Sequence, residues 1–153
     1  MTARVVNAQR QLFVSVPKMR RLARCVARRL RLSGRGIMSI VFIGAQRMRS
    51  INRQALGHDR VTDVLSFRYD QAPGSRLQPA ACSLQPIVGE ILIAPSQARA
   101  YAKAHGISYD EELARYVVHG LLHWMGQEDR TRAQQARMRR MENELLAHCG
   151  VRR

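Results

Sequence analysis

Hydrophobic residues recur along the chain with two periodicities, one typical of strands and one typical of helices. Short apolar runs rich in Val and Ile predict strands within residues 4–16, 37–43, 62–67 and 87–94. Apolar residues three or four positions apart predict helices at about residues 17–32, 45–56, 95–105, 108–125 and 131–147. The order strand, helix, strand, helix, strand, strand, helix, helix, helix predicts an α+β fold: a small mixed sheet of about four strands packed with helices.

We expect a single domain spanning residues 1–153. A chain of this length can bury one core, and 46% hydrophobic with 24% charged residues is typical of a globular protein. Residues 70–86, rich in Pro, Ala, Gln, Ser and Gly, are predicted to form a surface loop. No apolar run is long enough to cross a bilayer, so we expect no membrane partner.

The helix predicted at 108–125 has a broad apolar face and should be the central, buried one. Ser108 with Glu111 three residues later is the pattern of a capping box at its start. Gly126 is well suited to end it, since glycine tolerates the left-handed conformation that terminates helices.

Two histidines on this helix are the main chemical signal. His119 and His123 are four residues apart, so their rings lie on one face and can converge on one point. A turn at Gly126 would let the chain fold back and bring Asp129 to the rings; Glu128 is its neighbour and competitor. Two histidines and a carboxylate, with one position left open, are the ligand count of a catalytic zinc site. The alternative is a pair of helix histidines that only pack or face solvent.

Charge is the strongest compositional signal. Lys and Arg total 26 against 11 acids, a net charge of +15, and residues 1–58 contain thirteen basic side chains and no acid. Such a surface attracts polyanions, and guanidinium groups suit phosphate oxygens. The alternatives are a solvated basic face that reflects an arginine-rich proteome and, less favoured, a mitochondrial transit peptide. The candidate RNA contacts are Arg20, Arg21, Arg24, Arg28, Arg137 and Arg140.

The cysteines predict a reducing compartment. Cys25, Cys82 and Cys149 are odd in number, far apart and without a Cys-x-x-Cys pair. This pattern argues against a disulfide framework and fits a cytoplasmic location.

Three blocks of sequence carry a family resemblance. The first is Ile51-Asn52 followed by Thr62-Asp63-Val64-Leu65-Ser66-Phe67, the second is Val88-Gly89-Glu90-Ile91-Leu92-Ile93, and the third runs from His119 to Asp129. Together they resemble the YbeY family of bacterial rRNA-maturation endoribonucleases, and the order of elements extends the resemblance over nearly the whole chain.

The resemblance implies a metal-dependent, single-strand-directed endoribonuclease that acts in 16S rRNA 3′-end processing and ribosome quality control. It implies one zinc ion per chain, rRNA and the small ribosomal subunit as partners, and no small-molecule cofactor. The chain departs from the family pattern at two positions: Asp129 replaces a third histidine, and Leu56 replaces an arginine for which His58 or Arg60 are the nearby substitutes. Asp129 lowers the charge of the site by one, which predicts a higher pH optimum than that of a three-histidine relative.

Other functions remain open or are disfavoured. A non-catalytic ribosome-assembly factor would use the metal to fasten its fold and the arginines to bind rRNA. Gly120 stands where a zinc peptidase of the His-Glu-x-x-His type has its glutamate, and an iron oxygenase with two histidines and a carboxylate normally has a β-barrel. No general base is evident; Asp63 and Ser66 are expected to cap turns or hold their strand against the metal helix.

Overall fold

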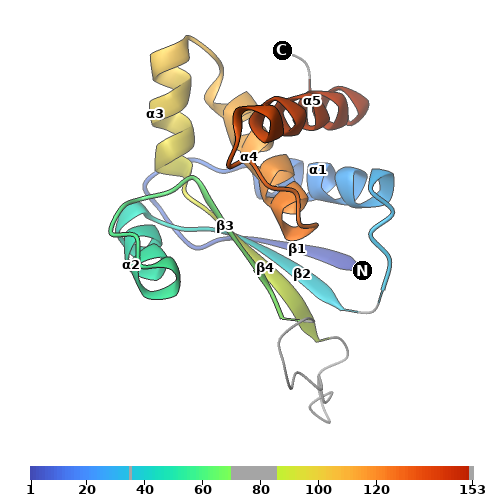
Figure 1. Cartoon of the computed structure of the whole chain (residues 1–153), viewed down its shortest axis with the longest axis horizontal. Coiled ribbons are helices and arrows are strands. Elements are labelled where there is room, and N and C mark those ends of the chain that lie inside the picture. Colours follow the sequence, from blue (N-terminus) through green and yellow to red (C-terminus); the bar gives the residue numbers. More distant parts are fainter. Residues whose placement is uncertain (35, 70–85, 152–153) are drawn as a thin grey trace.

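The computed structural model describes residues 1–34, 36–69 and 86–151, and its elements follow the predicted order (Figure 1). They are β1 (Thr2–Asn7), α1 (Val16–Arg29), β2 (Ile37–Phe42), α2 (Ala45–Leu56), β3 (Val64–Arg68), β4 (Ile87–Ile93), α3 (Pro95–His105), α4 (Tyr109–Trp124) and α5 (Arg132–His148). The loop predicted at 70–86 falls, except for its last residue, outside the described residues.

The four strands form one mixed sheet in the order β1-β2-β4-β3, which confirms the predicted α+β fold. Strands β1, β2 and β4 are parallel, and β3 pairs antiparallel with β4 at the edge. The parallel strands are joined by crossovers that contain helices, as parallel pairing requires.

Helices cover both faces of the sheet, and the strands send alternate side chains to each. Ile91 and Ile93 of β4 belong to the main core with α1, α4 and α5, which Figure 1 shows gathered on one side. Leu92 belongs to a smaller core with Met48 of α2 on the other side. The predicted central helix is therefore confirmed: α4 packs directly against β3 and β4.

Gly120 permits the close approach of α4 to the sheet. A Cβ atom there would clash with Ile91 and would lie 3.0 Å from a methyl group of Val64. A glycine within a helix lowers helix stability, but here it lets α4 lie against the sheet.

Two local predictions are wrong. Residues 8–15 are not a strand: Gln9 Oε1 accepts hydrogen bonds from the N–H groups of Gln11 and Leu12, both at 2.9 Å, which turns the chain. Ser108 is the N-cap of α4, but its side chain makes no capping hydrogen bond. The capping box lies instead at α5, between Thr131 and Gln134.

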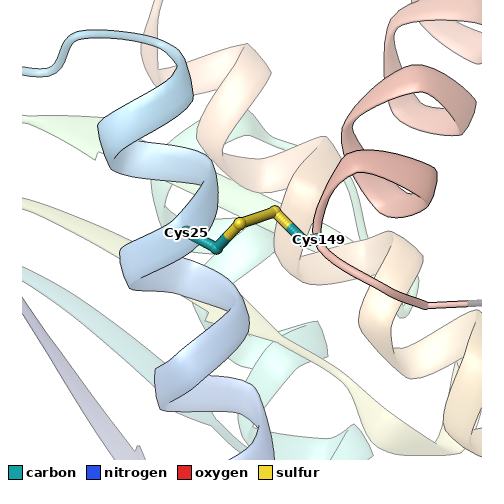
Figure 2. Close-up of a disulfide and its surroundings, with 2 residues drawn as sticks. All are labelled: Cys25 and Cys149. Carbon is teal, nitrogen blue, oxygen red and sulfur yellow. A yellow bond between two sulfur atoms is a disulfide. The ribbon is translucent and has the colours of Figure 1, made fainter.

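A disulfide joins Cys25 of α1 to Cys149 at the end of α5 (Figure 2). The expectation of no disulfide is therefore wrong, and the cysteines no longer support the predicted reducing compartment. The two cysteines are 124 residues apart in the sequence, which suggested that they are also far apart in space. However, α1 and α5 both pack on α4, and this packing brings the two Cα atoms to 5.9 Å. Cys82 lies outside the described residues. Within the described part of the chain, none of the helices combines the length and apolarity needed to cross a membrane.

Candidate metal centre

The two histidines of α4 turn the same ring nitrogen toward each other. His119 Nε2 and His123 Nε2 are 2.9 Å apart, and the rings meet edge to face with centroids 4.3 Å apart. One helical turn separates the residues, which places their side chains one above the other as predicted. Both are partly covered, with His119 14% and His123 28% exposed.

The end of α4 brings the carboxylate to them. Gly126 has a φ of 86°, its N–H donates to His123 O at 2.8 Å, and the N–H of Gln127 donates to Leu122 O at 3.0 Å. These two bonds form a Schellman motif, which ends the helix and reverses the chain. Asp129 then lies with Oδ2 3.7 Å from His119 Nε2 and Oδ1 3.7 Å from His123 Nε2.

The geometry selects Asp129 over its neighbour. One ligand atom from each of His119, His123 and Asp129 lies within 4.8 Å of the other two. Glu128 points elsewhere: its side chain is 51% exposed and lies 3.5 Å from Arg130. The structure thus brings together the three predicted metal ligands.

The opposite ring nitrogens are held by hydrogen bonds. His119 Nδ1 lies 2.8 Å from Glu142 Oε1, and His123 Nδ1 lies 2.8 Å from the carbonyl oxygen of Gln127. An ionised carboxylate and a carbonyl oxygen only accept, so each Nδ1 carries the proton and donates. In the neutral rings both Nε2 atoms then direct lone pairs at the same point, as in metal-binding histidines fixed by a carboxylate or a carbonyl.

This donor set fits a metal ion. The two Nε2 atoms are 2.9 Å apart, and their lone pairs repel unless a cation or a proton lies between them. The Asp129 carboxylate adds a third electron-pair donor, with negative charge. Imidazole and carboxylate ligands in this number are those of zinc sites that keep an open position. His119, His123 and Asp129 are therefore the residues that can hold such an ion.

The electrostatics of the two rings differ. Burial disfavours protonation of His119, but the hydrogen bond to Glu142 and the charges of Asp63 and Asp129 outweigh it, so the pKa of His119 is raised. Burial and the positive charge of His119 lower the pKa of His123. If one of the two histidines takes up an additional proton, Glu142 favours His119 as the one that is protonated.

Glu142 is the site residue that the sequence did not reveal. It is buried on α5, with Arg115 Nη1 3.1 Å from its Oε2 atom and Arg139 Nη1 at 3.5 Å. Burial opposes its ionisation, but the hydrogen bonds from His119 and Arg115 outweigh burial and lower the pKa of Glu142. The sequence does contain one indication of this role. Glu142 lies between Met138 and Leu145 on the buried face of α5, and a buried carboxylate requires a partner.

Asp63 and Ser66 take the structural roles expected of them. Asp63 Oδ1 accepts from the N–H of Val64 at 2.8 Å and from the Thr62 hydroxyl at 3.0 Å. Ser66 donates its hydroxyl to the carbonyl oxygen of Gly120 at 2.9 Å, which ties β3 to the metal helix. Asp63 also lines the cavity beside the metal ligands.

A cavity of about 290 Å³ adjoins the ligands. It is lined by Asp63, Tyr101, Glu112, Arg115, Tyr116, His119, Asp129, Gln135, Met138, Arg139 and Glu142. Its basic side chains are Arg115 and Arg139. Arg139 belongs to the arginine cluster at residues 130–140 that the sequence offered for phosphate contacts, but neither residue is among the six individual RNA contacts predicted. Leu56, at the family's arginine position, is 55% exposed at the end of α2, and His58 and Arg60 are exposed beyond it.

The predicted RNA contacts lie on two helices. Arg20, Arg21, Arg24 and Arg28 are exposed on α1, and Arg137 and Arg140 are exposed on α5. Arg21, Arg24 and Arg28 line a separate hollow of about 1060 Å³ between α1, the N-terminal strand and the end of the chain. The structure leaves these side chains available for phosphates.

Comparison with known proteins supports the family resemblance. The family model described as Endoribonuclease YbeY matches residues 5–150. The Endoribonuclease YbeY of Geobacillus kaustophilus is 32% identical over 76% of this chain and 74% of its own length. That of Anaeromyxobacter sp. strain Fw109-5 is 37% identical over 74% of this chain and 55% of its own length.

A solved structure shares the fold. The solution structure of a Thermotoga maritima protein superposes with a TM-score of 0.59 at 19% identity, covering 95% of this chain and 90% of that one. The fold, the three sequence blocks and the matched family model agree. The chain belongs to the YbeY family of endoribonucleases.

Proposed function

We propose that this protein is a zinc-dependent endoribonuclease that cleaves single-stranded segments of rRNA. Its proposed role is maturation of the 16S rRNA 3′ end and ribosome quality control, in the cytoplasm and on the small ribosomal subunit. Support comes from membership of a family whose relatives are named endoribonucleases and from a ligand set suited to one zinc ion per chain.

The convergence of the two Nε2 atoms is the observation that carries the proposal. Glu142 and Gln127 fix both rings from behind, so the ligand geometry is set before any ion binds. Such fixed ligands raise metal affinity because little order is lost on binding.

When bound, zinc would activate water and stabilise charge on the phosphate under attack. The residues of the chain supply binding and orientation. Arg139 is 47% exposed at the adjoining cavity and offers a cation to a phosphate oxygen. Arg115 lies deeper, 7% exposed, and its guanidinium holds Glu142 in place.

Remote phosphates of the RNA would contact the arginines of α1 and α5. Arg21, Arg24 and Arg28 share one rim, so a strand crossing that hollow would meet several charges. Reversing all three to Glu should lower rRNA affinity strongly and flatten its dependence on salt. Unchanged affinity would remove this part of the proposal.

The decisive experiment compares wild type with His119→Ala, with His148→Ala as the control for an exposed histidine on α5. Bound zinc is measured for each protein, and each is assayed on precursor 16S rRNA with and without chelator. We expect His119→Ala to lose both zinc and cleavage, and His148→Ala to keep both. Equal cleavage by all three would indicate a contaminating nuclease and refute the enzyme; rRNA binding without metal-dependent cleavage would favour the assembly factor.

A further inference from the structure

A groove leads away from the metal ligands between α3, α4 and α5. The cavity of about 290 Å³ beside His119 and Asp129 shares four lining residues with a second cavity of about 600 Å³. The shared residues are Tyr101, Glu112, Arg115 and Arg139. The second cavity extends to the turn between α3 and α4 at Gly106–Ser108. The two cavities are therefore adjacent along these shared side chains, and together they are the path described below.

The rim of this path carries an aromatic stack. The rings of Tyr101 and His105 are parallel within 17°, with centroids 3.8 Å apart, and both residues line the second cavity. Tyr101 is half-buried and His105 is exposed. Bases of single-stranded RNA bind to such rings by stacking, without regard to base identity.

A cation lies next to the stack. Arg139 Nη2 is 3.5 Å from the Tyr101 hydroxyl, and Arg139 Nη1 is 3.5 Å from Glu142 Oε2. Its guanidinium thus lies between the aromatic rim and the residue that orients His119. A nucleotide needs a flat apolar surface for its base and a cation for its phosphate, and this rim offers both beside the metal ligands.

The floor of the path holds a carboxylate oxygen that lacks a donor. Glu112 Oε2 is buried and makes no hydrogen bond among the described residues, although Arg115 Nε lies within 3.5 Å of it. Glu112 lines both cavities. A buried carboxylate oxygen without a donor is unfavourable, and the amino or ring N–H groups of a nucleobase are donors of the right kind.

We propose that this groove is a nucleotide subsite: it binds the nucleotide next to the cleaved bond of a single-stranded RNA, with the base on Tyr101 and the phosphate at Arg139. The inference rests on the proposed endoribonuclease function and names how its substrate is held. It assigns the substrate-orienting cation to α5, in a chain that has Leu56 at the family's arginine position.

The test measures binding apart from cleavage. A single-stranded 2′-O-methyl decamer with one 2-aminopurine is titrated into the zinc-loaded protein, and anisotropy and 2-aminopurine fluorescence are recorded. We expect stacking to quench the fluorescence of the wild-type complex. Tyr101→Leu should remove the quenching and weaken binding at least about fivefold, whereas Tyr101→Phe should retain both.

Arg139→Ala is compared with Arg47→Ala, which removes the same charge from α2, where the side chain is exposed, lines neither cavity and is not a predicted RNA contact. We expect Arg139→Ala to raise KM for a cleavable RNA several-fold more than Arg47→Ala. Thermal melting confirms that each variant is folded.

The outcomes separate the subsite from the enzyme. Cleavage by wild type with no quenching, or equal effects of Arg139→Ala and Arg47→Ala, would overturn the subsite and leave the enzyme standing. Quenching that depends on Tyr101, in a protein that does not cleave RNA, would support the subsite and overturn the endoribonuclease.

Discussion

Glu142 accepts a hydrogen bond from His119 across 23 residues of sequence, with 2.8 Å between its Oε1 atom and His119 Nδ1. This contact couples α5 to the metal helix. The carboxylate fixes the tautomer of His119 and increases the electron density at its Nε2 atom, which strengthens that nitrogen as a metal ligand. The packing of α5 on α4 therefore affects how strongly His119 could bind a metal ion.

Replacing Glu142 by Gln should weaken zinc binding by about 10- to 100-fold, the range for loss of a carboxylate behind a ligating histidine. The amide keeps the shape but loses the charge. Competition with a chromophoric chelator measures the change, and Glu144→Gln, exposed on the same helix, is the matched control. Equal affinities of the two variants would show that Glu142 does not tune the site.

Asp129 and Glu128 should respond differently to loss of charge. Asp129→Asn removes the charge of a carboxylate whose oxygens lie 3.7 Å from the two Nε2 atoms. Glu128→Gln removes the charge of a carboxylate that pairs with Arg130. We expect less than one zinc per chain after dialysis of Asp129→Asn and a full complement for Glu128→Gln. The reverse result would make Glu128 the third ligand.

The charge of the third ligand should set the pH dependence of cleavage. A carboxylate ligand would neutralise one unit of the charge of a bound zinc ion, so water at the open position would be less acidic than in a three-histidine site. Asp129→His should therefore move the rise of activity to lower pH. The pH–rate profiles of the two proteins provide the measurement, and superimposable profiles would contradict this account.

Gly120→Ala should destabilise the fold. The added methyl would clash with Ile91 and press on Val64, and overpacking of a core costs about 1–3 kcal/mol, more than the roughly 1 kcal/mol gained from helix propensity. Gly44→Ala, where nothing lies within 4 Å of the added atom, is the control. Urea unfolding compares them; a Gly120→Ala protein as stable as wild type would mean that α4 can move off the sheet freely.

Much of this fold could be predicted from the sequence because its signals are local. The apolar runs of β2 and β4 and the helical spacing of α4 determine elements within a few residues. His119, His123 and the Gly126 turn are likewise encoded within eleven residues, so the ligand set could be inferred.

Contacts between distant segments could not be predicted in this way. Glu142 acquires its role only when α5 packs on α4, and Cys25 meets Cys149 only because both helices share that neighbour. Residues 12–16 are apolar enough for a strand, but the Gln9 side chain turns the backbone just before them. Both Ser108 and Thr131 have a glutamate or glutamine three residues later, which is the pattern of a capping box. Only the structure shows that Thr131 and Gln134 form one and that the Ser108 side chain does not.

Reduction of the disulfide should lower stability. Closing a loop of 124 residues removes unfolded-state entropy worth about 5 kcal/mol in the chain-entropy model. We expect a large drop in the urea midpoint when wild type is reduced, the same low midpoint for Cys25→Ser, and no effect of reductant on Cys25→Ser. If reductant does not change the urea midpoint of wild type, the disulfide does not contribute to the stability of the fold.

The same bond changes the covalent topology of the molecule. From Cys25 to Cys149 the backbone and the two sulfurs form a closed ring that contains α2 to α5 and all strands except β1. A single peptide-bond cleavage inside that ring opens it but releases no fragment. On a non-reducing gel the cut protein would remain one species, and two pieces would separate only after reduction.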